Sequence, residues 1–261
     1  MENNIENQII GTRNFSVMKT HIPNFITLLN LSAGVMAILL ASMELLEEAA
    51  IMVIIASIFD FFDGFAARLL NAKSNIGKQL DSLADMVSFG VAPAMIMYFV
   101  LSDRLDNPVI TMDYQLIMRV STLIVPLLFP CFVALRLAKF NLDERQTTVF
   151  YGLPSPAAAF VLISLPFFPP FDYSLYVYTG IILLLGFLML SNIRLFSLKF
   201  TTYKIKDNIF RYALLIVALL LLFFLRMRSL PFIILAYIVL SMVQNLLNKL
   251  NTKQINSENG D

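Results

Sequence analysis

The stretch DFFDGFAARLLNAKSNIGKQLDSLADMVSFG, residues 60–90, places charged side chains inside a strongly apolar chain. It contains one arginine, Arg68, and four aspartates: Asp60, Asp63, Asp81 and Asp85. The sequence MVIIASIF precedes it and VAPAMIMYFVL follows it, so the charges lie between segments that suit a hydrocarbon layer. These carboxylates need a physical reason, because an ionised side chain is costly to bury without a partner.

The whole chain has the composition of a membrane protein. Of its 261 residues, 58% are hydrophobic and 14% are charged, whereas soluble domains are roughly half apolar and about a quarter charged. The net charge of +1 disfavours nucleic acid as a partner, because no basic field attracts a polyanion. The single cysteine, Cys131, excludes an intramolecular disulfide. We therefore expect an all-α integral membrane protein surrounded by membrane lipids.

A transmembrane helix needs about 20 mostly apolar residues, and eight segments approach this length. These segments are 23–42, 49–70, 79–101, 115–137, 154–169, 173–192, 209–225 and 229–247. The predicted fold is therefore a bundle of about eight transmembrane helices. We divide the chain into a juxtamembrane segment (1–21), a catalytic core (22–200), two additional helices (201–248) and a disordered tail (249–261).

Basic residues predict the orientation of the chain in the membrane. If the N-terminus is placed in the cytoplasm, 15 of the 19 Lys and Arg residues fall on the inner side. The outer side keeps only Arg104, Arg119, Arg226 and Arg228. This bias follows the excess of basic residues that cytoplasmic loops carry. We predict a multi-pass protein of the cytoplasmic membrane, with both termini in the cytoplasm and the aspartates near the cytoplasmic face.

Spacing sorts the aspartates onto two helix faces, because residues three or four apart lie on one side of a helix. In the second predicted helix this side carries Asp60, Asp63, Gly64 and Ala67. In the third it carries Gly77, Asp81, Asp85 and Ser88. A short turn around NAKSN joins the two helices, so the antiparallel pair brings all the carboxylates to a similar depth. The small residues on each face let another group approach closely.

Four unpaired aspartates would cost about 10 kcal/mol, at roughly 2.5–3.5 kcal/mol each, and Arg68 can offset only one. Oxygen ligands without His or Cys favour Mg²⁺, Mn²⁺ or Ca²⁺ over zinc. Four carboxylates are enough for two such ions, as used in phosphoryl transfer. Two other interpretations remain: structural aspartates held by hydrogen bonds, or an ion-coupled transporter. The transporter is disfavoured because the aspartates cluster near one membrane face and no inverted repeat is visible.

With its gaps, the stretch reads D-x2-D-G-x2-A-R-x8-G-x3-D-x3-D, from Asp60 to Asp85. It resembles the signature of the CDP-alcohol phosphotransferase family, whose integral-membrane enzymes displace CMP from a CDP-linked lipid with an alcohol. The stretch IPNFITLLNLSAG (22–34) resembles the nucleotide-facing start of the first helix in this family. Four further stretches resemble the membrane-embedded branch that uses L-serine as the alcohol: VSFGVAPA (87–94), RLAKFN (136–141), FYGLPSPAAA (150–159) and SNIRLFSLK (191–199).

The resemblance implies CDP-diacylglycerol and L-serine as substrates, two Mg²⁺ or Mn²⁺ ions, and a homodimer. The ions would be held by Asp60, Asp63, Asp81 and Asp85, and Asp85 would also be the general base for the hydroxyl group of serine. The CDP group would be bound by Asn24, Thr27, Gly64, Ala67, Arg68 and Gly77. Another acceptor within the family, glycerol-3-phosphate or an inositol phosphate, carries a dianionic phosphate that would need a denser basic cluster.

Serine carries a carboxylate that needs a cation. Arg136 or Lys139, at the inner end of the fourth predicted helix, can provide one. The alternative is that both side chains extend to lipid headgroups. Asn141 and Ser88 are candidates for the other polar groups of serine, although a packing role explains either equally well.

Overall fold

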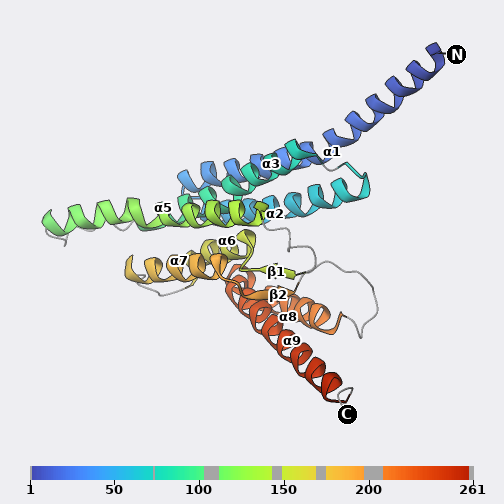
Figure 1. The fold of residues 1–261 in the computed structure, drawn as a ribbon. Helices are drawn as coiled ribbons and strands as arrows, with labels where there is room; N and C mark the ends of the chain where they lie inside the picture. The colour runs from blue at the N-terminus through green and yellow to red at the C-terminus, as the bar shows by residue number, and fades with distance from the viewer. Residues whose placement is uncertain are drawn as a thin grey trace. The chain divides into compact units, whose positions relative to one another are not determined.

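The computed structural model describes residues 2–72, 74–102, 112–142, 149–168, 175–196 and 208–258. The chain divides into two compact units, Met1–Leu137 and Ala138–Asp261. Helices make up nearly all of the described chain (Figure 1). The predicted all-α class is therefore confirmed, apart from one short pair of strands in the second unit.

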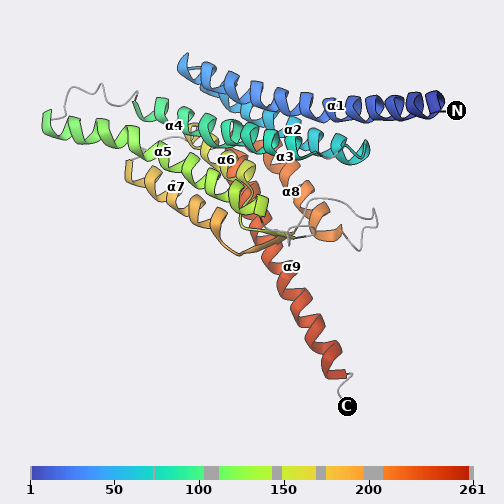
Figure 2. The same cartoon turned by 45° about the horizontal axis from the view of Figure 1, so that its top comes forward.

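The first unit is organised around α1 (Glu2–Ser42), which runs without a break through Pro23. The helices that follow are α2 (Leu46–Leu69), α3 (Asn75–Asp85), the π-helical turn η1 (Met86–Val91), α4 (Ala92–Ser102) and α5 (Met112–Leu142). Helix α1 packs against α2, α3, η1 and α4, and its place beside them can be followed in Figures 1 and 2. It therefore contacts both of the helices that carry the aspartates.

The turn between α2 and α3 is as short as the sequence predicts. The side chain of Ser74 caps α3 by accepting a hydrogen bond from the backbone N–H of Gly77, at 2.9 Å. Serine is a favoured residue at this position, because its oxygen satisfies a backbone donor that has no partner within the helix. Lys73 lies outside the described residues.

The third predicted segment, 79–101, forms one helical run from Asn75 to Ser102 that contains the π-helical turn η1 directly after Asp85. Turns of this kind occur frequently at functional sites. Here η1 crosses α1 at close range, since a Cβ atom added to Gly34 would overlap Oγ and Cα of Ser88. A glycine at position 34 is therefore required by the closeness of the two backbones.

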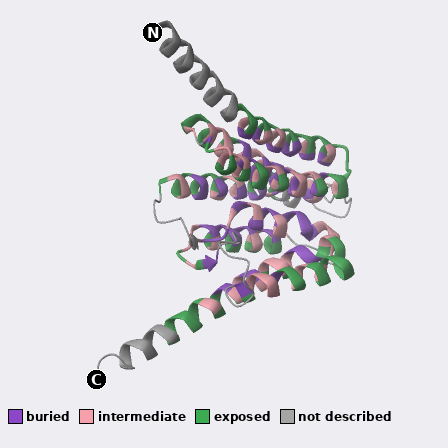
Figure 3. Ribbon diagram, turned by 90° about the vertical axis from the view of Figure 1, so that its right-hand side faces the viewer, coloured by how far each residue is buried: buried purple, intermediate pink, exposed green. Residues whose placement is uncertain are grey.

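The second unit contains α6 (Ser155–Ser164), η2 (Leu165–Phe167), α7 (Leu175–Leu190), α8 (Ile209–Leu225), η4 (Arg226–Ser229) and α9 (Leu230–Glu258). Strands β1 (Val149–Tyr151) and β2 (Arg194–Phe196) form an antiparallel pair, with Phe150 opposite Leu195. The sequence analysis missed this pair, because each strand is only 3 residues long. Within both units, buried and exposed positions alternate along the helices (Figure 3).

By length and composition, 5 helical stretches of the described chain can cross a membrane. They are His21–Ser42, Leu46–Leu69, Asn75–Ser102, Arg119–Leu142 and Ile209–Leu250. The last stretch includes parts of both α8 and α9, which η4 separates. The predicted segments 154–169 and 173–192 correspond to shorter apolar helices, Ser155–Phe167 and Leu175–Leu190. The chain is therefore an all-α membrane protein, whereas eight crossings and the predicted division into four segments stay predictions.

Helix α9 runs through Glu258 and so includes most of the segment expected to be a tail. Six of the basic residues used to predict the orientation of the chain lie outside the described residues: Lys73, Arg104, Arg145, Lys199, Lys204 and Lys206. The same is true of residues 259–261.

Candidate metal and nucleotide site

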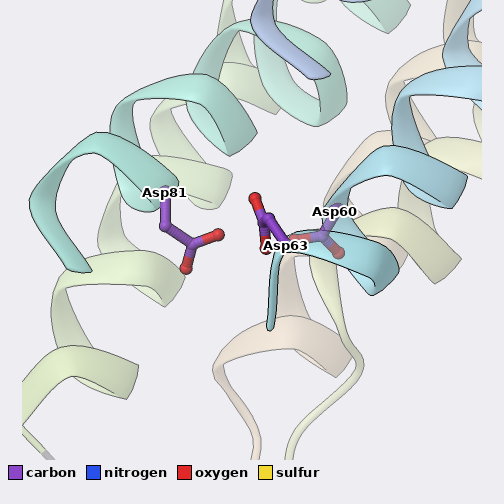
Figure 4. Close-up of side chains that lie close together, drawn as sticks. All are labelled: Asp60, Asp63 and Asp81. Atoms are coloured by element: carbon purple, nitrogen blue, oxygen red, sulfur yellow. The ribbon is translucent and has the colours of Figure 1, made fainter. Parts of the chain in front are cut away.

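Three of the predicted carboxylates come together in the first unit. Asp60 and Asp63 project from α2 and Asp81 projects from α3, and each contributes an oxygen atom that lies within 4.8 Å of the other two (Figure 4). Asp63 is buried, whereas Asp60 and Asp81 are half-buried. A cluster of oxygen ligands at this spacing can hold a hard divalent cation.

The fourth carboxylate, Asp85, lies next to this cluster and is buried, with 7% of its surface exposed. It interacts electrostatically with Asp60 and Asp81. It also accepts a hydrogen bond from Asn30 of α1, with a distance of 3.2 Å between Nδ2 and Oδ1. The carboxylate-bearing faces predicted for α2 and α3 therefore lie toward each other.

Thr27 contacts the cluster from α1. Its hydroxyl group lies 2.7 Å from Oδ2 of Asp63 and 3.0 Å from the backbone carbonyl oxygen of Pro23. The sequence predicts Thr27 as a contact for CDP. The structure places its hydroxyl group on a carboxylate of the cluster, where it can orient that carboxylate, and the contact to CDP stays a prediction.

The predicted small residues differ in their surroundings. A Cβ atom added to Gly64 would meet only the guanidinium group of Arg68, at 3.7 Å, so the space beside Gly64 is open. A Cβ atom added to Gly77 would lie 3.0 Å from Oδ1 of Asn24. Gly77 thus leaves room for Asn24, whereas Gly64 and the half-buried Ala67 leave room for a further group.

Among the described residues, Arg136 on α5 is a cation that acts on the aspartates. Its side chain is buried, with 9% of its surface exposed. It interacts electrostatically with Asp85, Asp60 and Asp81. The sequence analysis gave the offsetting role to Arg68, but that side chain is exposed. This expectation is corrected, because the charge of Arg136 is close to the carboxylates in space although distant from them in the sequence.

The other predicted serine contacts lie in different surroundings. The hydroxyl group of Ser88 is buried and donates a hydrogen bond to the backbone carbonyl oxygen of Asn30, at 3.0 Å. Lys139 is exposed, and its Nζ donates to the backbone carbonyl oxygen of Leu190 at 2.9 Å, at the end of α7. Asn141 is half-buried near the end of α5. Of the four candidates, Arg136 interacts electrostatically with the aspartates, and Ser88 is linked to Asp85 through Asn30.

Comparison with known proteins identifies the family. The family model described as CDP-alcohol phosphatidyltransferase matches residues 20–191, which include all four aspartates, Asn30 and Arg136. The chain belongs to this family. The resemblance seen in the sequence is thereby confirmed, and the match covers both helix faces of the site.

Curated relatives in the family are similar over most of the chain. The CDP-diacylglycerol–serine O-phosphatidyltransferase of Bacillus subtilis is 34% identical over 70% of this chain and 92% of that protein. The protein of the same name from Helicobacter pylori (strain J99) is 36% identical over 77% of this chain and 81% of its own. A third, from Methanocaldococcus jannaschii, is 34% identical over 69% of this chain and 76% of its own.

The sequence analysis missed one polar residue of the site, Asn30. It lies within the matched region and is fully buried, yet it contacts the carboxylate of Asp85. A signal was present, because Asn30 follows Thr27 by three positions in an otherwise apolar run and so shares its helix face. Only the fold shows that this face lies against both α2 and α3.

Proposed function

We propose that this protein transfers the phosphatidyl group of CDP-diacylglycerol to L-serine, giving phosphatidylserine and CMP. The observation that carries the proposal is the set of facing carboxylates on α2 and α3, in a chain that is 34–36% identical to proteins named CDP-diacylglycerol–serine O-phosphatidyltransferase. The protein is accordingly a membrane-embedded transferase of phospholipid biosynthesis.

The donor set fits hard divalent ions. Asp60, Asp63 and Asp81 present oxygen atoms within 4.8 Å of one another, and Asp85 stands beside them. We assign two ions, Mg²⁺ or Mn²⁺, to these four carboxylates, in keeping with the ligands that such ions prefer. When bound, the ions supply positive charge that neutralises the pyrophosphate and stabilises CMP as it leaves.

The CDP group is assigned to the open space beside Gly64. Arg68 borders that space, and its guanidinium group can pair with a phosphate oxygen. Ala67 keeps the same face of α2 small, while Asn24 offers an amide next to Gly77. Glycines where a backbone must approach a ligand closely are common in phosphate sites.

Asp85 is assigned as the general base. It accepts the hydroxyl proton of serine, so that the serine oxygen forms a bond to the phosphorus atom that carries diacylglycerol. The bond from that phosphorus to the bridging oxygen breaks, and CMP leaves with the electron pair. A carboxylate positioned for such proton transfer typically contributes a factor of about 10²–10⁴ to the rate.

Arg136 is assigned to the carboxylate of serine. Its guanidinium group is buried beside Asp85, whereas Lys139 donates to the end of α7. An arginine can bind a carboxylate with two parallel hydrogen bonds, which orients as well as attracts it. This arrangement would place the amino acid with its hydroxyl group near the general base.

The decisive experiment offers purified protein CDP-diacylglycerol with L-serine, glycerol-3-phosphate or an inositol phosphate, and measures release of CMP with Mg²⁺, with Mn²⁺ and with EDTA. We expect release that requires serine and a divalent ion. Release with a phosphorylated acceptor alone would move the protein to another branch of the family. Binding of CDP without release of CMP for any acceptor would contradict a transferase.

We further propose eight membrane crossings, both termini and the active site on the cytoplasmic side of the cytoplasmic membrane, and a homodimer as in the resembling family. The distribution of Lys and Arg supports this orientation. After Cys131 is replaced by serine, a cysteine at either terminus should be protected from an impermeant thiol reagent in intact cells. A cysteine replacing Glu44, in the predicted outer turn between α1 and α2, should react. Labelling of a terminus from outside would reverse the orientation.

A further inference from the structure

Asn30 occupies a fully buried position on α1, between the two helices that carry the aspartates. Its Nδ2 donates a hydrogen bond to Oδ1 of Asp85 at 3.2 Å. Its backbone carbonyl oxygen accepts a hydrogen bond from Ser88 at 3.0 Å. The side chain and the backbone of the same residue therefore contact α3 and η1 at two neighbouring points.

The amide of Asn30 is oriented by Asp85. A carboxylate only accepts hydrogen bonds, so the nitrogen of the amide must face it. The amide oxygen, Oδ1, is buried and has no hydrogen-bond partner among the described residues. Burying an amide with one end unsatisfied is unfavourable for the fold. The bond to Asp85 is therefore what this residue gains over an apolar side chain of similar size.

Thr27 makes the corresponding contact to the other aspartate-bearing helix. It lies one helical turn before Asn30 on α1 and donates to Oδ2 of Asp63, at 2.7 Å. Helix α1 thus presents one donor to a carboxylate of the metal cluster and a second donor to the proposed general base. Donors that fix carboxylates in this way orient them for metal binding or proton transfer.

We infer that Asn30 is a positioning residue for Asp85. It holds Oδ1 of that carboxyl group and so sets the orientation in which the carboxyl group accepts the hydroxyl proton of the acceptor alcohol. The inference rests on the proposed function, in which Asp85 is the base. The two donors on this face of α1 therefore differ in role, because Thr27 orients a carboxylate assigned to metal binding alone, whereas Asn30 orients the carboxylate that is also assigned as the base.

The role of the Asn30 side chain can be separated by mutation from the role of its backbone, which accepts the hydrogen bond from Ser88. Ser88 donates to the backbone of Asn30, so any residue at position 30 retains that link between α1 and η1. Asn30→Leu removes the amide and keeps the branched shape of the side chain at Cγ. Asn30→Gln retains an amide donor. Thr27→Val removes the other donor, and Ser32→Ala changes an exposed hydroxyl group on the same helix as a control.

The experiment measures three quantities for each variant: binding of CDP with Mn²⁺ by calorimetry, kcat, and KM for serine. For Asn30→Leu we expect kcat to fall about ten- to a hundredfold, the size of one lost hydrogen bond to a charged group. Binding of CDP and KM for serine should change less than about threefold, because the cluster and Arg136 are intact. Asn30→Gln should recover at least part of the loss in kcat.

Thr27→Val should behave differently, with an affinity for Mn²⁺ lowered about 10- to 100-fold and kcat largely restored at high Mn²⁺. Ser32→Ala should match the wild type. If Asn30→Leu does not fold, Asn30→Ala takes its place, with the same expected split between kcat and binding.

Several results would overturn the inference. These are normal turnover by the Leu or Ala variant, a loss of CDP binding in proportion to turnover, or an Asn30→Gln variant as slow as Asn30→Leu while both bind CDP. Each leaves the proposed function intact if the wild type releases CMP with serine. A wild type that does not release CMP with serine contradicts the proposed function, and this inference with it.

Discussion

The two units of the chain differ in the polar side chains that they bring together. In the first unit, four carboxylates lie close together and one buried arginine, Arg136, acts on them. In the second unit, polar side chains donate to backbone carbonyl oxygens: Tyr237 to Phe196 at 2.8 Å, and Asn245 to Arg194 at 2.7 Å. The first arrangement gathers more carboxylates than the one arginine that acts on them, whereas the second consists of neutral hydrogen bonds from side chains to the backbone.

This difference distinguishes a binding site from a structural network. Buried polar groups are ordinarily satisfied within the protein, as α9 does for strand β2. An excess of carboxylates favours the binding of a cation that is not part of the chain. Arg136 and Lys139 illustrate the contrast, since they lie three residues apart on α5 but serve the cluster and the end of α7, respectively.

The largest effect is expected from the metal cluster. Asp81→Asn keeps the shape of the side chain and removes a ligand charge, so turnover should fall more than about 10³-fold, because a divalent ion contributes several kcal/mol to the transition state. Binding of CDP in the presence of Mn²⁺, measured by calorimetry, should be lost with it. Glu48→Gln, an exposed acid on the same helix as Asp60, is the control and should be unchanged. Full activity of Asp81→Asn, or of EDTA-treated protein, would contradict the metal site.

The general base should produce the next effect. Asp85→Asn cannot accept a proton, so turnover should decrease about 10²–10⁴-fold. Binding of CDP should weaken much less, because Asp60, Asp63 and Asp81 remain. The measurement pairs the rate of CMP release with calorimetric binding of CDP. Equal losses of binding in the Asp85 and Asp81 variants would remove the distinction between base and ligand.

Arg136 and Lys139, both on α5, provide the sharpest comparison between the units. Arg136→Gln should raise KM for serine about 10- to 100-fold, since one charge-assisted contact to the carboxylate is lost. Lys139→Gln should change KM less than about threefold, because an exposed donor to a helix end is worth a few tenths of a kcal/mol to about 1 kcal/mol of stability. Steady-state kinetics with varied serine checks both. A larger effect at Lys139 than at Arg136 would reverse the assignment.

The smallest effect is expected for the hydrogen bonds between α9 and strand β2 in the second unit. Tyr237→Phe removes the hydrogen bond to Phe196 and should lower the free energy of unfolding by about 1 kcal/mol. Turnover per folded molecule should not change, because the residue belongs to the strand-supporting network. Denaturation in detergent gives the stability, and Tyr176→Phe, at an exposed tyrosine of α7, is the control. A selective loss of turnover would mean that this network serves the reaction.

The sequence by itself determined the membrane class and the aspartate faces of α2 and α3. Hydrophobic segments of sufficient length are visible in the chain, and spacings of three and four residues place side chains on one side of a helix regardless of the rest of the fold. The sequence also predicted the short turn around NAKSN, whereas its cap by Ser74 is seen only in the structure. The pattern from Asp60 to Asp85 was sufficient to identify the family.

The tertiary structure decided which distant residues complete these faces. Asn30 and Asp85 are 55 residues apart, and Lys139 and Leu190 are 51 apart, so no local period relates them. The assignment of Arg136 rather than Arg68 to the aspartates, the π-helical turn opposite Gly34, and the pairing of β1 with β2 depend in the same way on which segments pack together. Local spacing fixes the direction of a side chain on its own helix, whereas its partner is set by packing between helices.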